Sequence, residues 1–176
     1  GANCGYYSLT IAKNIKNISV IAFEPNKEAF LKFSKSLDIN SNLSEKINLN
    51  NFGLSNVSKK LKMQTMVKFG YQQTGGAGVT NNNTNLKNNI SFFADFKIGD
   101  EYLKLKDEKL SLKIDVEGHE LNVLEGINKT LVKNKCILQI EIFEKNFNSV
   151  NNYLLSMGYK KIFEVKNKSN FFYSNF

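Results

Sequence analysis

Short apolar runs alternate with amphipathic stretches along most of the chain. Residues 18–23 are a continuous apolar run rich in β-branched side chains, and residues 136–143 are mainly apolar with Gln139 and Glu141 among them; both segments predict buried strands. Residues 8–15 and 24–37 carry apolar side chains at helical spacing, and Pro25 stands near the start of the second of these helices. Further elements are expected as strands at 46–55, 90–96 and 109–115, helices at 119–134 and 148–158, and a final antiparallel pair at 159–165 and 170–176.

The middle third of the chain has a different character. Residues 58–69 alternate between polar and apolar positions and predict one arm of an extended hairpin. Residues 70–89 consist mainly of Gly, Asn and Thr and offer almost nothing to bury. A polar stretch of this length inside a domain is typical of either a disordered segment or a functional lid, and both interpretations stay open.

Strands that are separated by helices of this length indicate βαβ units. The sequence therefore predicts an α/β fold, with a mainly parallel sheet and helices on both faces. Ligands of such sheets bind at the carboxyl ends of the strands, so the residues that follow each strand are the first place to look for chemistry.

Composition narrows the class of protein. A chain of 176 residues with 41% hydrophobic side chains predicts one globular domain over residues 1–176. The net charge is +8, but all 24 basic residues are lysines spread thinly along the chain, which makes a dedicated nucleic-acid surface the less favoured interpretation. Cys4 and Cys136 lie far apart, no secretory signal precedes them, and no apolar run is long enough to cross a bilayer. We expect a cytoplasmic protein with free thiols and no membrane partner.

The first turn between a strand and a helix would be GANCG, residues 1–5, directly before the helix at 8–15. Its glycines allow a ligand to approach the backbone, and the helix beyond it offers unpaired N–H groups. Glu24 follows the next strand, where a carboxylate can accept hydrogen bonds from both hydroxyls of a ribose. Together these features indicate an adenosine-containing cofactor. The alternative is an ordinary acidic residue beside Pro25 at a helix start.

Two adenosine cofactors would suit a Gly-rich turn with a ribose acid: NAD and S-adenosylmethionine. The dinucleotide fingerprint requires G-x-G-x-x-G around a pyrophosphate, and GANCGY lacks it. A smaller cofactor without phosphate fits better.

Five segments resemble, in this order and spacing, the FkbM family of S-adenosylmethionine-dependent methyltransferases. They are GANCGYYSL at 1–9, AFEPN at 22–26, NNFGLS at 50–55, LKIDVEGHELNVLEGI at 112–127 and LQIEIF at 138–143. The resemblance covers nearly the whole chain, and KIDVEGHE is its most specific part. It implies a Rossmann-like class I methyltransferase fold with a seven-stranded, mostly parallel sheet, and O-methylation of a sugar or another small-molecule hydroxyl.

The resemblance also assigns residues to the cofactor S-adenosyl-L-methionine. Gly1, Asn3 and Gly5 would line its methionine end, Glu24 the ribose, and Asn51 with Phe52 the adenine. Family members have a hydrophobic strand before the Gly-rich turn, whereas this chain starts at Gly1. Without that central strand, the strands that end at Glu24 and Asp115 would expose unpaired backbone N–H and C=O groups. We therefore expect a chain truncated at its N-terminus.

The segment KIDVEGHE carries the candidate catalytic residues. The two-residue period of a strand places Asp115 and Glu117 on one side at the carboxyl end of the strand at 109–115, beside the cofactor site, so Asp115 is also a candidate cofactor-binding residue. Glu141 on the neighbouring strand can face the same cleft, so three carboxylates would converge. Asp115 and Glu117 are our candidates for positioning and proton acceptance, and His119 is the second candidate for the base.

Simpler roles compete for the same residues. Acidic side chains such as Glu117 and Glu120 are favoured at a helix N-terminus by the helix dipole alone, and this role is the favoured one for Glu120. A solvent-facing position in the first helical turn is favoured over a catalytic role for His119. Oxygen ligands could hold a metal here, but nothing in the sequence requires one, and no metal is predicted.

Two classes of function follow. The first is an O-methyltransferase for a small-molecule or glycan acceptor, with residues 70–89 forming part of the acceptor pocket or a lid. The second is a cofactor-binding module without catalysis, or a methyltransferase for a macromolecule such as nucleic acid. No Pro-Pro-aromatic motif of the kind that grips a base amine follows the strand at 109–115, so nucleic acid is the less favoured acceptor.

Overall fold

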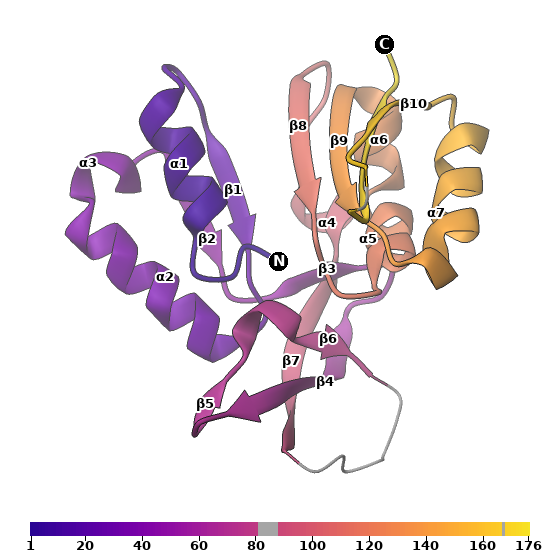
Figure 1. Ribbon diagram of the computed structural model, residues 1–176. Coiled ribbons are helices and arrows are strands. Elements are labelled where there is room, and N and C mark those ends of the chain that lie inside the picture. Colours follow the sequence, from indigo (N-terminus) through magenta and orange to yellow (C-terminus); the bar gives the residue numbers. More distant parts are fainter. Residues whose placement is uncertain (81–87, 167) are drawn as a thin grey trace. The chain divides into compact units, whose positions relative to one another are not determined.

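The computed structural model describes residues 1–80, 88–166 and 168–176. By its internal contacts the chain divides into two compact units, and each is described by itself (Figure 1). Unit 1 contains Gly1–Gly53 and Lys59–Phe96, and unit 2 contains Leu54–Ser58 and Lys97–Phe176. A single domain over residues 1–176 stays a prediction.

Unit 1 combines helices, a short parallel sheet and an antiparallel arm. Its elements in chain order are α1 (Tyr6–Asn14), β1 (Val20–Phe23), α2 (Lys27–Ile39), α3 (Ser41–Ser44), β2 (Ile47–Asn50), β3 (Gly53–Ser55), β4 (Lys59–Lys68), β5 (Tyr71–Gln72), a 3₁₀ helix (Thr74–Gly76), β6 (Gly78–Val79) and β7 (Asn89–Ile98). The ends of β3 and β7 extend into unit 2.

Strands β1 and β2 pair in parallel from Val20↔Ile47 to Phe23↔Asn50. This pair and its helices enclose a core of Ala12, Ala22, Phe33, Leu43 and Ile47.

The antiparallel arm is centred on β4. Strand β7 pairs with β4 from Lys59↔Phe96 to Met66↔Asn89, and β5 and β6 also pair antiparallel with β4. The sequence-based prediction of an extended hairpin arm is therefore confirmed. In the polar stretch 70–89, residues 71–79 form β5, the 3₁₀ helix and β6, whereas residues 81–87, which belong to the predicted lid or disordered segment, lie outside the described residues.

Unit 2 is a mixed sheet covered by helices. Its elements are α4 (Gly99–Tyr102), β8 (Lys109–Ile114), α5 (Glu120–Gly126), α6 (Asn128–Lys133), β9 (Lys135–Glu141), α7 (Glu144–Ser156), β10 (Lys160–Glu164) and β11 (Asn170–Ser174). The strand order is β10-β11-β9-β8. Helix α6 packs against β9 and α5 against α7 (Figure 1). The core is apolar and includes Leu124, Leu131, Leu138, Ile140 and Leu154, all fully buried.

The predicted α/β class is confirmed, but the prediction of one mainly parallel sheet is confirmed only in part. Parallel pairing occurs in β1–β2 and in β8–β9, whereas β11 pairs antiparallel with both β9 and β10. The described strands fall into three sheets rather than one seven-stranded sheet. Short turns such as the one at Phe69–Gly70 join antiparallel neighbours directly, while parallel neighbours need a crossover. Each described helix is too short or too polar to span a bilayer.

Two elements that the sequence predicts as continuous are interrupted in the structure. The strand expected at 46–55 breaks at Asn51, whose side-chain amide donates to the backbone carbonyl of Glu24 at 2.9 Å. The helix expected at 119–134 divides into α5 and α6. The Asp100 carboxylate accepts hydrogen bonds from the backbone N–H groups of Lys129 and Thr130 at 2.7 and 2.8 Å, and so it starts a new helix. Both interruptions come from residues distant in sequence.

Gly126 allows α5 to pass directly over the backbone of Ser55. A Cβ at residue 126 would overlap the Ser55 carbonyl oxygen. We expect Gly126→Ala to lower the free energy of unfolding by about 3 kcal/mol, because two backbones cannot move apart without disturbing the core. Urea denaturation measures this change. Gly76→Ala is the control, since a Cβ there meets nothing within 4 Å; equal stability of both variants would contradict the expectation.

Candidate active site

The Glu24 carboxylate is the centre of the site in unit 1. It follows β1 directly and is only 5% exposed. Its Oε2 accepts a hydrogen bond from the backbone N–H of Asn3 at 2.7 Å, and its Oε1 accepts one from the backbone N–H of Asn26 at 2.8 Å. One buried side chain therefore connects the turn before α1 to the turn before α2.

The first turn takes its shape from three of the predicted residues. A Cβ on Gly1 would collide with Glu24 Oε2, and a Cβ on Gly5 would enter the ring of Phe33. Gly5 has φ 88°, and Asn3 has φ 49°, a left-handed conformation that Asn tolerates better than most residues. The Ala2 N–H donates to the Phe23 carbonyl at 2.9 Å, which fastens the turn to the end of β1. The structure thus brings Gly1 and Asn3 to Glu24, and it packs Gly5 against α2.

Asn51 and Phe52 lie at the same end of β1. The Asn51 side-chain amide donates to the Glu24 backbone carbonyl at 2.9 Å. The Phe52 ring is 8% exposed and packs against Phe23, with 5.4 Å between ring centroids. Both residues lie at the end of β1, where the resemblance assigns the nucleoside; their contact with adenine stays a prediction.

Three neighbours of this site were not among the candidates from sequence. Thr74 Oγ1 donates to Asn3 Oδ1 at 2.9 Å, and the Asn26 amide lies 3.4 Å from Gln72 Oε1. Asn26 also caps α2, since its Oδ1 accepts from the Glu28 N–H at 2.9 Å. Only Asn26 has a sequence signal, an Asn directly before a helical apolar pattern. Gln72 and Thr74 come from a polar stretch without periodicity.

The site in unit 2 is a group of carboxylates at the ends of β8 and β9. The register of β8 and β9 ends at Ile114↔Ile140, and Asp115 and Glu141 are the residues that directly follow this pair. The convergence of three carboxylates, with Glu117 as the third, stays a prediction. Lys113 Nζ contacts Asp115 Oδ2 at 2.7 Å, with both side chains partly exposed. Burial, and next the negative charge of Asp115, raise the pKa of Glu141. Among the described residues, no group of three or more His, Cys, Asp or Glu side chains is arranged to hold a metal.

Glu117 occupies a strained turn beside these carboxylates. Its φ is 54°, left-handed and uncommon for a Glu, and Gly118 continues the turn with φ 101°. Strained backbone of this kind often accompanies functional sites. Burial raises the pKa of Glu117, and the charges of Asp115 and Glu141 raise it further. A carboxylate with a raised pKa binds a proton more readily than an ordinary one, which is what a general base requires.

His119 is buried, so the favoured expectation of a solvent-facing residue is wrong. It is 9% exposed and forms the N-cap position of α5, and its Nε2 lies 2.9 Å from Ser55 Oγ. Burial lowers its pKa to about 4, which keeps the imidazole neutral near pH 7. Glu120 lies in the first turn of α5, is 1% exposed, and its Oε1 accepts from the Gly118 N–H at 2.7 Å; its stabilisation by the helix dipole stays a prediction.

We expect His119→Gln to flatten the pH dependence of stability between about pH 6.5 and pH 4. The folded pKa is about 4 and the usual value is 6.5, so in this window the unfolded chain binds a proton that the folded chain does not. The contribution of neutral His119 to the free energy of unfolding is therefore fully present above pH 6.5. It is lost as the pH falls toward 4, by about 3 kcal/mol in total. Urea denaturation of both proteins from pH 7 to pH 4 measures the difference.

Glutamine is the matched replacement, because its side-chain amide can also bond Ser55 Oγ but does not titrate. The raised pKa values of Glu117 and Glu141 act in the opposite direction, yet they are common to both proteins and cancel in the comparison. Parallel stability curves for the two proteins would contradict the lowered pKa of His119.

Two solved structures share this mixed α/β fold, and both are connected with methyl transfer. The methyltransferase FkbM of Methylobacillus flagellatus KT aligns with a TM-score of 0.67 and 17% identity, over 99% of this chain and 41% of that chain. A candidate rRNA methylase from Clostridium thermocellum aligns with a TM-score of 0.52 and 11% identity, over 99% of this chain and 81% of that one. The chain thus spans less than half the length of the first of these structures.

The likeness to these two structures concerns the fold, and the family comparison identifies the class of protein. The model of the methyltransferase FkbM domain matches residues 1–161, so the chain belongs to the FkbM methyltransferase family. The resemblance seen in its motifs is therefore confirmed. No curated protein matches the sequence.

Proposed function

We propose that this protein is an S-adenosylmethionine-dependent O-methyltransferase whose acceptor is a hydroxyl group of a sugar or another small molecule. Membership of a methyltransferase family supports the reaction class. The observation that supports this cofactor is the buried Glu24 carboxylate, which two backbone N–H groups hold at the end of β1. The parallel pairs β1–β2 and β8–β9 belong, in this proposal, to a Rossmann-like class I methyltransferase fold.

The residues around Glu24 fit an adenosine cofactor. Each carboxylate oxygen can accept two hydrogen bonds, so Glu24 can hold the backbone of both turns and also accept from ribose hydroxyls. Gly1 permits close approach, because a Cβ there would occupy the space beside Glu24 Oε2. Asn3 and Gly5 shape the turn that holds the methionine part, and Asn51 with Phe52 contact the adenine. Bound S-adenosylmethionine supplies an electrophilic methyl group.

The carboxylates of unit 2 handle the proton of the acceptor. An alcohol that gains a methyl group on its oxygen loses its hydroxyl proton, which a base must accept. Glu117 is that base in this proposal, since its pKa is raised by burial and by its acidic neighbours. Asp115 orients the acceptor and raises the proton affinity of Glu117. His119 is a weaker candidate, because a pKa of about 4 leaves it a poor proton acceptor.

The proposal is tested in two stages on the whole protein. Calorimetric titration with S-adenosylmethionine and S-adenosylhomocysteine should show binding of both, and absence of binding would end the proposal. Methyl-labelled S-adenosylmethionine is then offered with panels of free sugars, glycans and hydroxylated small molecules. Binding without any transfer would indicate a cofactor-binding module, and transfer only to RNA would replace the proposed acceptor class.

A further inference from the structure

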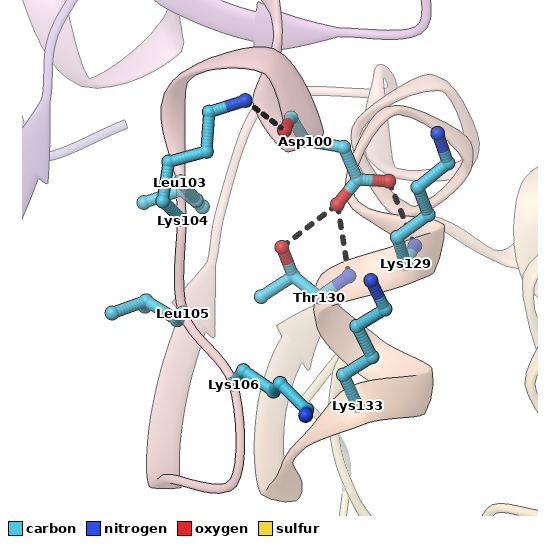
Figure 2. Close-up of a pocket in the computed structure, with 8 residues that line it drawn as sticks. All are labelled: Asp100, Leu103, Lys104, Leu105, Lys106, Lys129, Thr130 and Lys133. Atoms are coloured by element: carbon cyan, nitrogen blue, oxygen red, sulfur yellow. Dashed lines mark hydrogen bonds between the residues drawn. The ribbon is translucent and has the colours of Figure 1, made fainter.

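Unit 2 contains a pocket that the proposed methyl transfer does not use. It is a surface pocket of about 350 Å³, open to solvent on one side, between α6 and the loop that joins α4 to β8. Figure 2 shows Lys104 and Lys106 on the loop and Lys129 and Lys133 on the helix that faces it. This volume lies within the range of about 300–1,000 Å³ that is typical of ligand pockets.

The pocket is strongly basic. Four lysines and one aspartate line it, which leaves a formal charge of +3 at neutral pH. The aspartate, Asp100, is committed to the protein itself, because its carboxylate accepts two backbone N–H groups at the start of α6 (Figure 2). Among the described residues, no carboxylate forms an ion pair with Lys129 or Lys133. These two ammonium groups are therefore available to an anion from outside.

The two loop lysines are also weakly held. Lys104 Nζ lies 3.4 Å from the backbone carbonyl of Asp100, a long contact to a neutral group. Lys106 Nζ lies 3.6 Å from Asp107 Oδ2, but both side chains are more than 70% exposed, so water and salt screen this pair. An incoming anion could displace either contact at little cost.

We propose that this pocket binds the phosphate groups of a small phosphorylated molecule, such as a phosphate monoester or a diphosphate. Lysine recognises phosphate as a point charge, and several lysines around one pocket suit a ligand of two or three negative charges better than a single carboxylate. The volume accommodates a small molecule rather than a long polymer. Leu103 and Leu105 line the same pocket and offer apolar contact to the carbon part of the ligand.

Inorganic pyrophosphate is the probe, with inorganic phosphate and acetate as comparisons. We expect calorimetric titration of the whole protein to show saturable binding of pyrophosphate, weaker binding of phosphate and none of acetate. In Lys129→Gln/Lys133→Gln the affinity for pyrophosphate should fall at least about tenfold, since two charge-assisted contacts are lost. Both side chains are exposed, so the thermal unfolding temperature should not change.

Lys145→Gln/Lys160→Gln is the matched control. It removes the same charge from exposed positions on α7 and β10, outside the pocket, and should bind pyrophosphate as the wild type does. An equal loss in both double variants would show attraction to net charge alone and overturn the proposal. Absence of saturable binding, or binding of acetate as tight as that of pyrophosphate, would overturn it as well. None of these outcomes depends on methyl transfer.

Discussion

Glu117→Gln is expected to lower kcat for methyl transfer by about 100- to 10,000-fold, the range associated with loss of a general base. Glutamine keeps the size of the side chain but cannot accept the hydroxyl proton of the acceptor. The KM for the acceptor should change far less, because Gln retains an oxygen that can contact the hydroxyl. Steady-state kinetics with saturating S-adenosylmethionine separates the two constants.

The control is Glu144→Gln, which removes a carboxylate from an exposed position at the start of α7. It should leave kcat unchanged. A second variant, Asp115→Asn, tests what raises the pKa of Glu117. The negative charge of Asp115 raises this pKa. Removal of that charge should therefore move the acidic limb of the pH–rate profile to lower pH. Wild-type kcat in Glu117→Gln, or an unmoved profile in Asp115→Asn, would remove Glu117 as the base.

Glu24→Gln is expected to weaken binding of S-adenosylmethionine by roughly 100-fold, or about 3 kcal/mol, because hydrogen bonds to a charged acceptor are lost. An amide also cannot satisfy both backbone donors, since its nitrogen would face the N–H of either Asn3 or Asn26. The free energy of unfolding should therefore fall by about 1–3 kcal/mol as well. Calorimetry well below the unfolding temperature keeps the two effects apart.

Glu28→Gln provides the comparison for Glu24. Glu28 lies in the first turn of α2 and forms a partly exposed i,i+4 ion pair with Lys32, so its replacement should affect neither binding nor stability by more than about 0.5 kcal/mol. Glu24→Gln with an affinity within twofold of the wild type would show that this carboxylate does not contact the cofactor.

The sequence located the candidate site better than it described the residues in it. Glu24 and Asp115 were recognised as candidates because each directly follows a predicted strand, and the alternation of strands and helices is visible in local apolar spacing. The buried contact of His119 was not visible, since its partner Ser55 lies 64 residues earlier. For the same reason Thr74 was missed, although its hydroxyl bonds Asn3.

The sequence by itself determined the family, the α/β class, most helices and strands, and the acidic residues at strand ends, because each of these depends on spacing within a few residues. Only the tertiary structure decided the break at Asn51, the division of the helix at 119–134 by Asp100, and the burial that lowers the pKa of His119. Each of these depends on a hydrogen bond or on burial between residues distant in sequence. Desolvation and long-range capping have no local pattern, so they become visible only when the chain is folded.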